Sequence, residues 1–529
     1  MGAVIINKTK GISGRVPAGF DFYTGLCLYG TAPSVTGKWA PYTGTPSIVY
    51  QQMFSIADAT SAGIIPFSEN TASTSTLVIS TKGNTGDTLN PVATIPVSIS
   101  STYPAGTKSI SLGTYTVGAG DTTIALQGAA LAAVINAGTY IHGFSASFTT
   151  ATLTITAPKS CGVSLNTGTI YSYNLNSGTG FVLGTITQNV ISGTASQYAI
   201  WYYHINRYFV QNPTGNLWVS ITASSTSFNE LVTLQAAAGS KLRQIGIYDT
   251  DVTRGAAANI AATILSVQNA ALLIDKTAPV SVFYSPNFAA VTDLSTYPDQ
   301  NLNTANKVET ILSQDGNQAG NLLYIVSGQT VGNIGDKLGT ISSSRVSSSD
   351  AQPISDFNLA IDGVENNLPA FGNGKLLSQV SVGLRTQLDN YNYVFFRTFG
   401  DTVAGTYWTS NKCCIVNTSS YAYVNDNRVA DKVSRILYST LVPQLESELI
   451  FNANGTLTDF TIQSFITQGQ SAITAGMITG YGNLPLISGN PVLTIDPTQK
   501  VKQTNNLVIN CSIEENGIAR NITVNLSYQ

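Results

Sequence analysis

The residue types that most often do chemistry in proteins are scarce in this sequence. Among its 529 residues are only two histidines, His142 and His204, so any Ser-His-Asp or Cys-His arrangement must use one of them. His142 lies at an expected turn of a β-rich region, and His204 lies in the aromatic run 201–209. Both positions favour a histidine with a structural role over a catalytic base.

Motifs that bind metals or phosphate groups, or that expose a nucleophile, are also missing. Cys413 and Cys414 are adjacent and have neither the spacing nor the histidine partners of a zinc site, so we interpret them as small buried apolar residues. Gly37 and Lys38 lack the upstream glycine of a phosphate-binding loop, and no Gly-x-Ser-x-Gly motif occurs. We therefore predict no catalytic, cofactor-binding or metal-binding residues and a protein that is not an enzyme. A pair of glycosidase carboxylates among the 28 acidic residues is the enzymatic alternative.

The composition indicates a surface suited to self-association. Hydrophobic residues make up 43% of the chain, which is enough for sizeable cores, but charged residues make up only 10%. Soluble domains usually have roughly 25% charged residues. A charge-poor, hydroxyl-rich surface has little repulsion to oppose contact between copies, which suits a homo-oligomeric polymer. The net charge of −3 comes without basic runs, so we expect no nucleic-acid partner.

The sequence also predicts a protein without direct membrane insertion. Apolar stretches such as Ile200–Tyr203 and Ala270–Ile274 are far shorter than the ~18–20 residues of a bilayer span. The apolar run Val4–Ile6 is shorter than the roughly 7–15 residues of a secretory signal. Five cysteines are an odd number scattered along a long chain, which fits a reducing compartment. We expect folding and assembly in a cytoplasm.

The hydrophobic pattern of the sequence changes at several points, between strand-like and helix-like periodicity. We therefore predict an α/β fold with a β-rich insertion. The predicted parts are 1–65, an N-terminal arm and the start of the core; 66–193, a β-rich insertion; 194–400, an α/β core; 401–490, a helical part; and 491–529, a C-terminal β-hairpin arm.

Within the core, strand and helix patterns alternate as in a mostly parallel sheet with helices on both faces. Ile245–Tyr248 and Val280–Tyr284 are predicted strands joined by a helix over Ala256–Ile274. We further predict a helix over Asn303–Leu312 and a strand over Leu322–Val326.

The C-terminal part contains two predicted helices and then a hairpin. The first helix runs from about 421 to 445, where Pro443 kinks or ends it, and the second from about 458 to 474. Arg428, Lys432 and Arg435 on the first helix indicate either a solvated face or a surface turned to a partner. The alternating runs 507–513 and 518–526, separated by Asn-Gly, predict a β-hairpin.

An isolated hairpin is marginal and needs further strands, which come either from the same chain or from a neighbouring copy by β-augmentation. The residues that we assign to intersubunit strands alternate with polar ones or form a short apolar run. They are Val4, Ile5, Ile6, Leu507, Val508, Ile509, Ile518, Ile522, Val524 and Leu526.

Two segments resemble contractile phage tail sheath proteins, including the sheaths of phage-like injection systems. Gly405-Thr-Tyr-Trp-Thr-Ser, followed by the aromatic entry into a long helix at 421–437, is similar to the C-terminal part of that family. The run 203–219 and the strand and helix after it are similar to the family core, and the insertion with Gly-Asp-Thr-Thr at Gly120 resembles modules of phage tail proteins.

The resemblance implies exchange of N- and C-terminal strands in a helical sheath around an inner tail tube protein, with baseplate and tail-terminator proteins as further partners. It implies a location in the virion tail, an outward-facing insertion, contraction that drives the tube through a target envelope, and no cofactor. Arg428, Lys432 and Arg435 would then be the tube-facing side chains. The alternative is an adhesin or decoration protein whose β-rich module binds glycan or a receptor.

Overall fold

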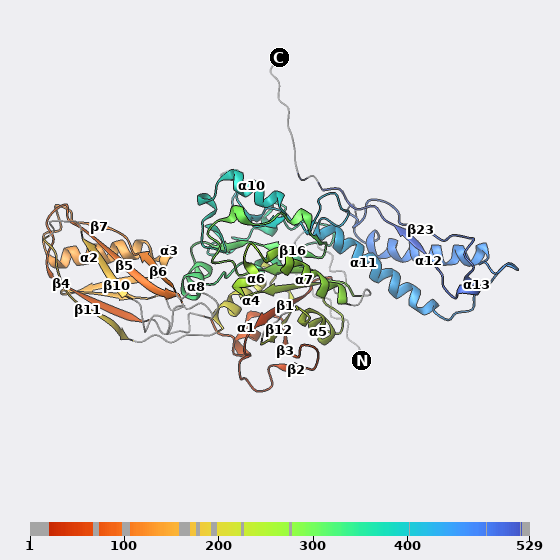
Figure 1. Cartoon of the computed structure of the whole chain (residues 1–529), viewed down its shortest axis with the longest axis horizontal. Coiled ribbons are helices and arrows are strands. Elements are labelled where there is room, and N and C mark those ends of the chain that lie inside the picture. Colours follow the sequence, from red (N-terminus) through yellow and green to blue (C-terminus); the bar gives the residue numbers. More distant parts are fainter. Residues whose placement is uncertain are drawn as a thin grey trace, which may run out of the picture.

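The structure is a computed structural model, and it divides into three parts that follow one another along the longest axis of the molecule (Figure 1). An α/β core lies in the centre, the β-rich insertion lies at one end, and an arm built on two helices lies at the other. The described residues are 21–66, 73–97, 106–157, 170–175, 180–191, 198–223, 227–274, 278–400, 403–482, 484–518 and 520.

The core is built on one eight-stranded sheet with the order β19-β16-β14-β13-β1-β12-β3-β2. The first six strands of this order are parallel to their neighbours, while β3 is antiparallel to β12 and β2 is antiparallel to β3. The predicted mostly parallel α/β sheet is therefore confirmed. Its strands are β1 (Tyr23–Tyr29), β2 (Ala40–Tyr42), β3 (Ile48–Met53), β12 (Asn216–Thr222), β13 (Gln244–Tyr248), β14 (Ser281–Ser285), β16 (Val308–Ile311) and β19 (Tyr393–Val394).

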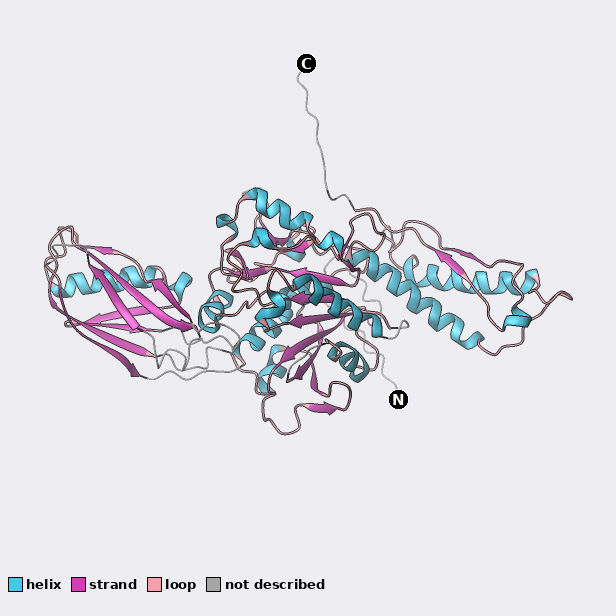
Figure 2. Ribbon diagram, in the orientation of Figure 1, coloured by secondary structure: helices cyan, strands magenta, loops and turns pink. Residues whose placement is uncertain are grey.

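Helices cover both faces of this sheet, because successive side chains of a strand point to opposite faces and here both sets are apolar (Figure 2). In β1, Leu26 and Leu28 belong to one buried cluster, and Cys27 and Tyr29 to the other. The first face packs against α1 (Ile56–Ser61), α4 (Ala199–Gln211) and α9 (Ile334–Ser343). The second packs against α5 (Glu230–Ala237), α7 (Ile260–Leu273) and α10 (Val382–Asn390).

Short elements complete the core around this sheet. Its remaining strands form three two-stranded pairs, β15 with β22, β17 with β18 and β20 with β21. These elements are α6 (Val252–Gly255), η3 (Leu294–Thr296), η4 (Gln300–Leu302), β15 (Thr304–Ala305), β17 (Ser313–Asp315), α8 (Ala319–Ser327), η5 (Ser355–Phe357), β18 (Pro369–Phe371), η6 (Leu377–Gln379), β20 (Phe396–Arg397), β21 (Tyr407–Trp408) and β22 (Cys414–Ile415).

Two predicted elements of the core are wrong. The predicted helix over Asn303–Leu312 forms β15 and β16, since the buried run 308–311 fits between β14 and β19. The predicted strand Leu322–Val326 lies in α8. The Glu365 carboxylate accepts hydrogen bonds from the backbone N–H groups of Ala319 and Gly320, at 3.0 and 3.3 Å, and so satisfies the start of that helix from a distant part of the chain.

The insertion contains two four-stranded sheets around one apolar core. Helix α2 is capped by Thr123, whose hydroxyl accepts a hydrogen bond from Leu126 N–H. One sheet has the order β11-β4-β9-β8, and the other contains β10, β5, β6 and β7. The elements are β4 (Thr74–Thr81), β5 (Thr88–Val97), β6 (Gly106–Ser111), β7 (Tyr115–Thr116), α2 (Ile124–Ala137), α3 (Thr139–His142), β8 (Ser145–Thr149), β9 (Thr152–Thr156), β10 (Ile170–Leu175) and β11 (Val182–Ile191).

The arm consists of two long helices with a small sheet beside them. The first, α11, ends at Leu441 and passes into a single 3-10 turn that contains Pro443, as predicted for a residue without a backbone N–H. In the described residues, no helix has the length and apolar character needed to cross a membrane. The arm contains α11 (Val424–Leu441), η7 (Val442–Gln444), α12 (Asp459–Met477), β23 (Val492–Thr494), α13 (Val501–Thr504) and β24 (Asn510–Ser512).

A fully buried ion cluster links α9 to the sheet. Lys337 Nζ lies 2.6 Å from Glu309 Oε1 and 2.8 Å from Asp350 Oδ2, and all three side chains have no exposed surface. Burial raises the pKa of the Glu309 carboxyl to about 8. At neutral pH the Glu309 carboxyl is therefore mostly protonated.

We predict that Lys337→Met destabilises the core by about 3–5 kcal/mol, because Asp350 then stays buried without its cation. Urea unfolding monitored by tryptophan fluorescence measures the loss, and Trp408, whose ring lies 5.1 Å from Lys337 Nζ, contributes to that signal. Lys412→Met is the control, since its pair with Asp389 is partly exposed and is worth up to about 1 kcal/mol. Equal losses for the two variants would contradict the assignment.

Candidate assembly surfaces

Both histidines are buried, in keeping with the predicted structural role. His204 has no exposed surface, and in the described part of the chain neither ring nitrogen has a hydrogen-bond partner. Its ring lies 4.6 Å from that of Tyr248, and burial lowers its pKa to about 3. His142 ends α3 and accepts a hydrogen bond from Phe144 N–H through Nδ1 at 3.1 Å. A histidine with a pKa of about 3 is neutral near pH 7 and is a poor general base there.

The cysteines are also placed as predicted. Cys413 and Cys414 are buried, and burial raises the pKa of both thiols, that of Cys414 to about 12. Cys511, by contrast, is exposed on β24. Within the described ranges, His, Cys, Asp and Glu form no group of three or more that is placed to hold a metal ion.

The basic residues of α11 are not a free surface. Arg428 is 5% exposed, and its guanidinium donates to Ser344 Oγ at 2.9 Å and to the carbonyl of Arg345 at 3.3 Å. Lys432 and Arg435 bind the two carboxylate oxygens of Asp21 at 2.6 and 3.0 Å. The expectation of a solvated face at Arg428, Lys432 and Arg435 is therefore wrong for the folded chain, because these side chains fasten α11 to the core. Their contact with a tube stays a prediction.

The C-terminal strand region is only partly as predicted. Leu507 and Ile509 pack against the apolar cores of the arm, and Val508 between them is 49% exposed, so the predicted alternation is present. Asn510–Ser512 forms β24, which pairs antiparallel with β23 of the same chain through Thr494–Asn510, Leu493–Cys511 and Val492–Ser512.

The predicted Asn-Gly turn is not formed. A tight type I′ turn requires positive φ at both central residues, and neither Asn516 nor Gly517 has one. The chain instead continues along 487–488, with a bridge between Ile487 and Glu515 and a 2.9 Å hydrogen bond from Ser488 N–H to the Glu514 carbonyl.

Of the remaining residues predicted to form intersubunit strands, Ile518 is described by the structure and the others are not. Ile518 is half-buried and lies outside the strands. Val4, Ile5 and Ile6 near the N-terminus, and Ile522, Val524 and Leu526 near the C-terminus, lie outside the described residues.

Both outer edges of the β23–β24 sheet lack a further strand among the described residues, since the sheet has two strands. All three residues of β24 are exposed, and Val492 of β23 is 53% exposed. Unpaired backbone N–H and C=O groups at such edges are ready to pair with another strand. The small sheet is the described feature best suited to accept a strand from a neighbouring chain.

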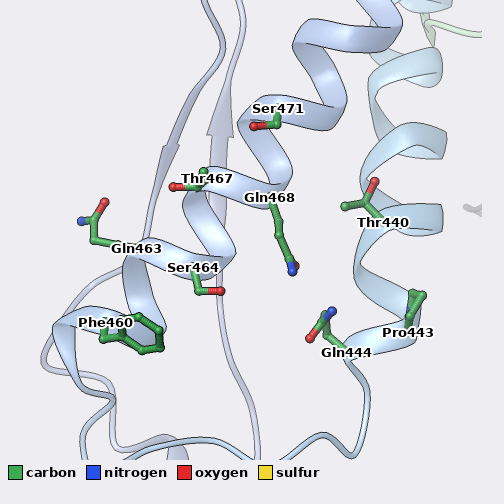
Figure 3. Close-up of a pocket in the computed structure, with 9 residues that line it drawn as sticks. All are labelled: Thr440, Pro443, Gln444, Phe460, Gln463, Ser464, Thr467, Gln468 and Ser471. Carbon is green, nitrogen blue, oxygen red and sulfur yellow. The ribbon is translucent and has the colours of Figure 1, made fainter.

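The tip of the arm has an exposed groove that the sequence analysis missed. An open hollow of about 770 Å³ lies between the end of α11 and the face of α12, and all of its lining side chains are uncharged (Figure 3). Phe460, at the start of α12, is 75% exposed beside it, and Leu445 beyond η7 is 73% exposed. A phenylalanine directly after the Thr458-Asp459 start of the helix is the only signal of this surface in the sequence. The groove is lined by Thr440, Pro443, Gln444, Phe460, Gln463, Ser464, Thr467, Gln468 and Ser471.

No family model and no curated protein matches this chain. Among solved structures, it is similar to a chain in the cryo-electron microscopy structure of the anti-feeding prophage baseplate, determined with six-fold symmetry applied. The TM-score is 0.39 with 13% identical residues, and the match covers 64% of this chain and 83% of that chain. At this TM-score the likeness assigns neither a family nor a function.

The segment 514–518 is attached to the start of α11 by a pair of carboxyl groups, Asp426 and Glu515. Asp426, in the first turn of α11, faces Glu515, and the Arg520 guanidinium lies over the ring of Tyr423. Burial and the adjacent Glu515 raise the pKa of Asp426 to about 7, although Arg520 opposes this.

We predict that this attachment weakens as the pH rises. The pKa of Asp426 is about 7 in the folded chain, whereas an unfolded Asp has a pKa near 3.9. The folded state therefore binds a proton more tightly, and its contribution is full below about pH 4 and is lost through pH 7. Hydrogen exchange of amides 514–518, corrected for intrinsic rates, should show less protection at about pH 8 than at about pH 5.5.

Asp426→Asn should remove this pH dependence, whereas Asp496→Asn in the same arm should keep it. Among the described residues, the Asp496 side chain bonds with Thr498 of its own turn, away from residues 514–518. Unchanged protection of the wild-type segment across this range would exclude the carboxyl pair as the cause.

Proposed function

We propose that this chain is a structural, non-enzymatic subunit of a contractile tail sheath. It would polymerise helically around an inner tube protein, meet baseplate and terminator proteins at the ends of the tail, and contract to drive the tube through a target cell envelope. The resemblance of the segments 203–219 and 405–437 to that family is the starting point, and the geometry of the chain supports the idea at three places.

The observation that carries the proposal is the open two-stranded sheet β23–β24. A two-stranded sheet is marginal in water and gains stability from each strand added to it. Main-chain hydrogen bonds to an added strand keep subunits connected while their bodies turn against each other. The apolar alternation of Ile522, Val524 and Leu526 is typical of the strand that a neighbour would donate.

A second support is that several of the few charged side chains form ion pairs inside the subunit. In a chain with only 10% charged residues, several are used inside the subunit. Arg207 is buried and binds Asp336 at 2.8 Å as well as Asp362, and Lys337 is buried in its own cluster. The outer surface is left with few charges to desolvate when copies pack against each other.

A third support is the exposed apolar surface of the arm, at Phe460 and Leu445, which becomes buried when subunits pack. Contraction releases free energy if the short state buries more surface of this kind than the extended state, so no hydrolysis is required. The insertion, at the opposite end from the arm in Figure 1, is then the part that faces outward.

We predict that replacing Ile522, Val524 and Leu526 with serine abolishes tube formation. Under strand donation these side chains would be buried in a neighbouring subunit, so the isolated folded subunit should keep its melting temperature to within about 2 °C. Negative-stain microscopy and sedimentation measure assembly, and circular dichroism measures the melting temperature.

The matched control replaces the alternate residues Asn521, Thr523 and Asn525 with alanine, which leaves the apolar face of the donated strand unchanged. Tubes formed by the serine variant would disprove strand donation. A closed oligomer of the wild type, with or without tube protein, would favour the adhesin or decoration alternative.

A further inference from the structure

The short turn η4 of the core holds its polar side chains inward and its leucine outward. Leu302 is 86% exposed, the largest exposed fraction among the large apolar side chains of the described residues. Gln300 Nε2 donates to Tyr393 Oη at 2.7 Å. Asn301 Nδ2 donates to the Asn390 carbonyl at 2.6 Å. Hydrogen bonds to the core therefore fix a turn that presents a leucine to water, which indicates a contact with another surface.

Further apolar side chains are exposed beside this leucine. The Asn392 side-chain amide donates to Asn301 Oδ1 at 3.1 Å and to the Ile415 carbonyl at 2.7 Å, so it joins η4 to β22. Val416, directly after β22, is 45% exposed, and Tyr421 on the turn that follows is 47% exposed. We call these three exposed apolar residues the η4 patch: Leu302, Val416 and Tyr421.

The η4 patch and the groove at the tip of the arm are both poor in charge. The stretches 300–306 and 413–425, which carry the patch, contain no charged residue. The same is true of 436–445 and 460–477, which supply the lining of the groove. Lys412, directly before the second of these stretches, is held in an ion pair within the chain. Contact between the two surfaces therefore desolvates few ions.

The groove supplies the hollow surface that an outward leucine needs. Phe460, which lines it, is 75% exposed, the second largest such fraction among the described residues (Figure 3). Glu446 and Asp459 lie next to the lining stretches in the sequence, but their side chains are not part of the lining. A leucine that enters the groove can cover the phenylalanine ring without meeting a charge in the lining.

One chain does not bring its own patch and groove together, because α11 separates them. The patch lies just before the start of α11, and the groove lies at its other end, in the arm (Figure 1). The helix has 18 residues, so it is about 27 Å long at ~1.5 Å per residue. A contact between two different surfaces of one kind of chain joins copies head to tail, and such a contact can continue into an open polymer.

We propose that the groove binds the η4 patch of a second copy, with Leu302 against Phe460. The contact arranges copies in a row in which the tip of the arm of one chain lies on the core of the next. This inference rests on the proposed self-assembly, but it does not depend on strand donation by the C-terminal segment.

Substitution of the two central side chains by aspartate tests the contact in the full chain. Leu302→Asp and Phe460→Asp each place a charge in the contact, so each should raise the protein concentration needed for assembly by about tenfold or more. Sedimentation and negative-stain microscopy measure assembly. Both variants should keep the melting temperature of the wild type, because the two side chains are exposed in the subunit. Leu126→Asp on α2 changes an exposed leucine of the insertion and should leave assembly unchanged.

Cysteine cross-linking shows which surfaces meet. In a background with Cys161 and Cys511 replaced by serine, one preparation carries Leu302→Cys and another carries Ser464→Cys in the groove. A short bismaleimide should link chains in the mixture and not in either preparation alone. An assembled mixture without cross-links, or tubes formed by Leu302→Asp at the wild-type concentration, would overturn this contact and leave the proposed sheath standing. A wild type that stays monomeric, with or without tube protein, would overturn both.

Discussion

Coverage of a parallel sheet on both faces is the constraint on which the rest of the structure depends. Strands β19 to β12 are parallel, so each connection must cross from one end of the sheet to the other, and the crossing segments supply the helices on both faces. The insertion leaves the core between α1 and α4 on one face. Its apolar core continues onto Ala199 and Tyr203 of α4 and Tyr324 of α8, which joins the two parts by packing.

Ion pairs join the arm to the core beside the apolar contacts of Val424 and Val346. Asp21, which directly precedes the central sheet, binds Lys432 and Arg435 of α11, and Lys307 before β16 binds Asp431. A junction of this kind responds to ions and to pH in a way that an apolar junction does not. In a sheath subunit, a junction between rigid bodies is where one packing arrangement changes into another.

Much of the fold follows from local pattern, and the errors have a common physical cause. The helix α7, the strands β13 and β14 and the end of α11 near Pro443 are set by periodicity and backbone chemistry, which the sequence displays directly. The run at 322–326 became a helix because Glu365 caps it from 46 positions away, and no local pattern contains that contact. The same holds for the basic residues of α11, since Asp21 lies 411 positions before Lys432. At the C-terminus, an Asn-Gly pair suggested a hairpin, but pairing of Glu515 with Ile487 took its place.

Cryo-electron microscopy of the assembled chain is the decisive test of strand donation between subunits. We expect hollow helical tubes in which a strand from a neighbouring subunit lies against the open edge of β23 or β24, in main-chain hydrogen-bond register. Discrete closed particles, or tubes whose β23–β24 edges stay unpaired between subunits, would contradict it.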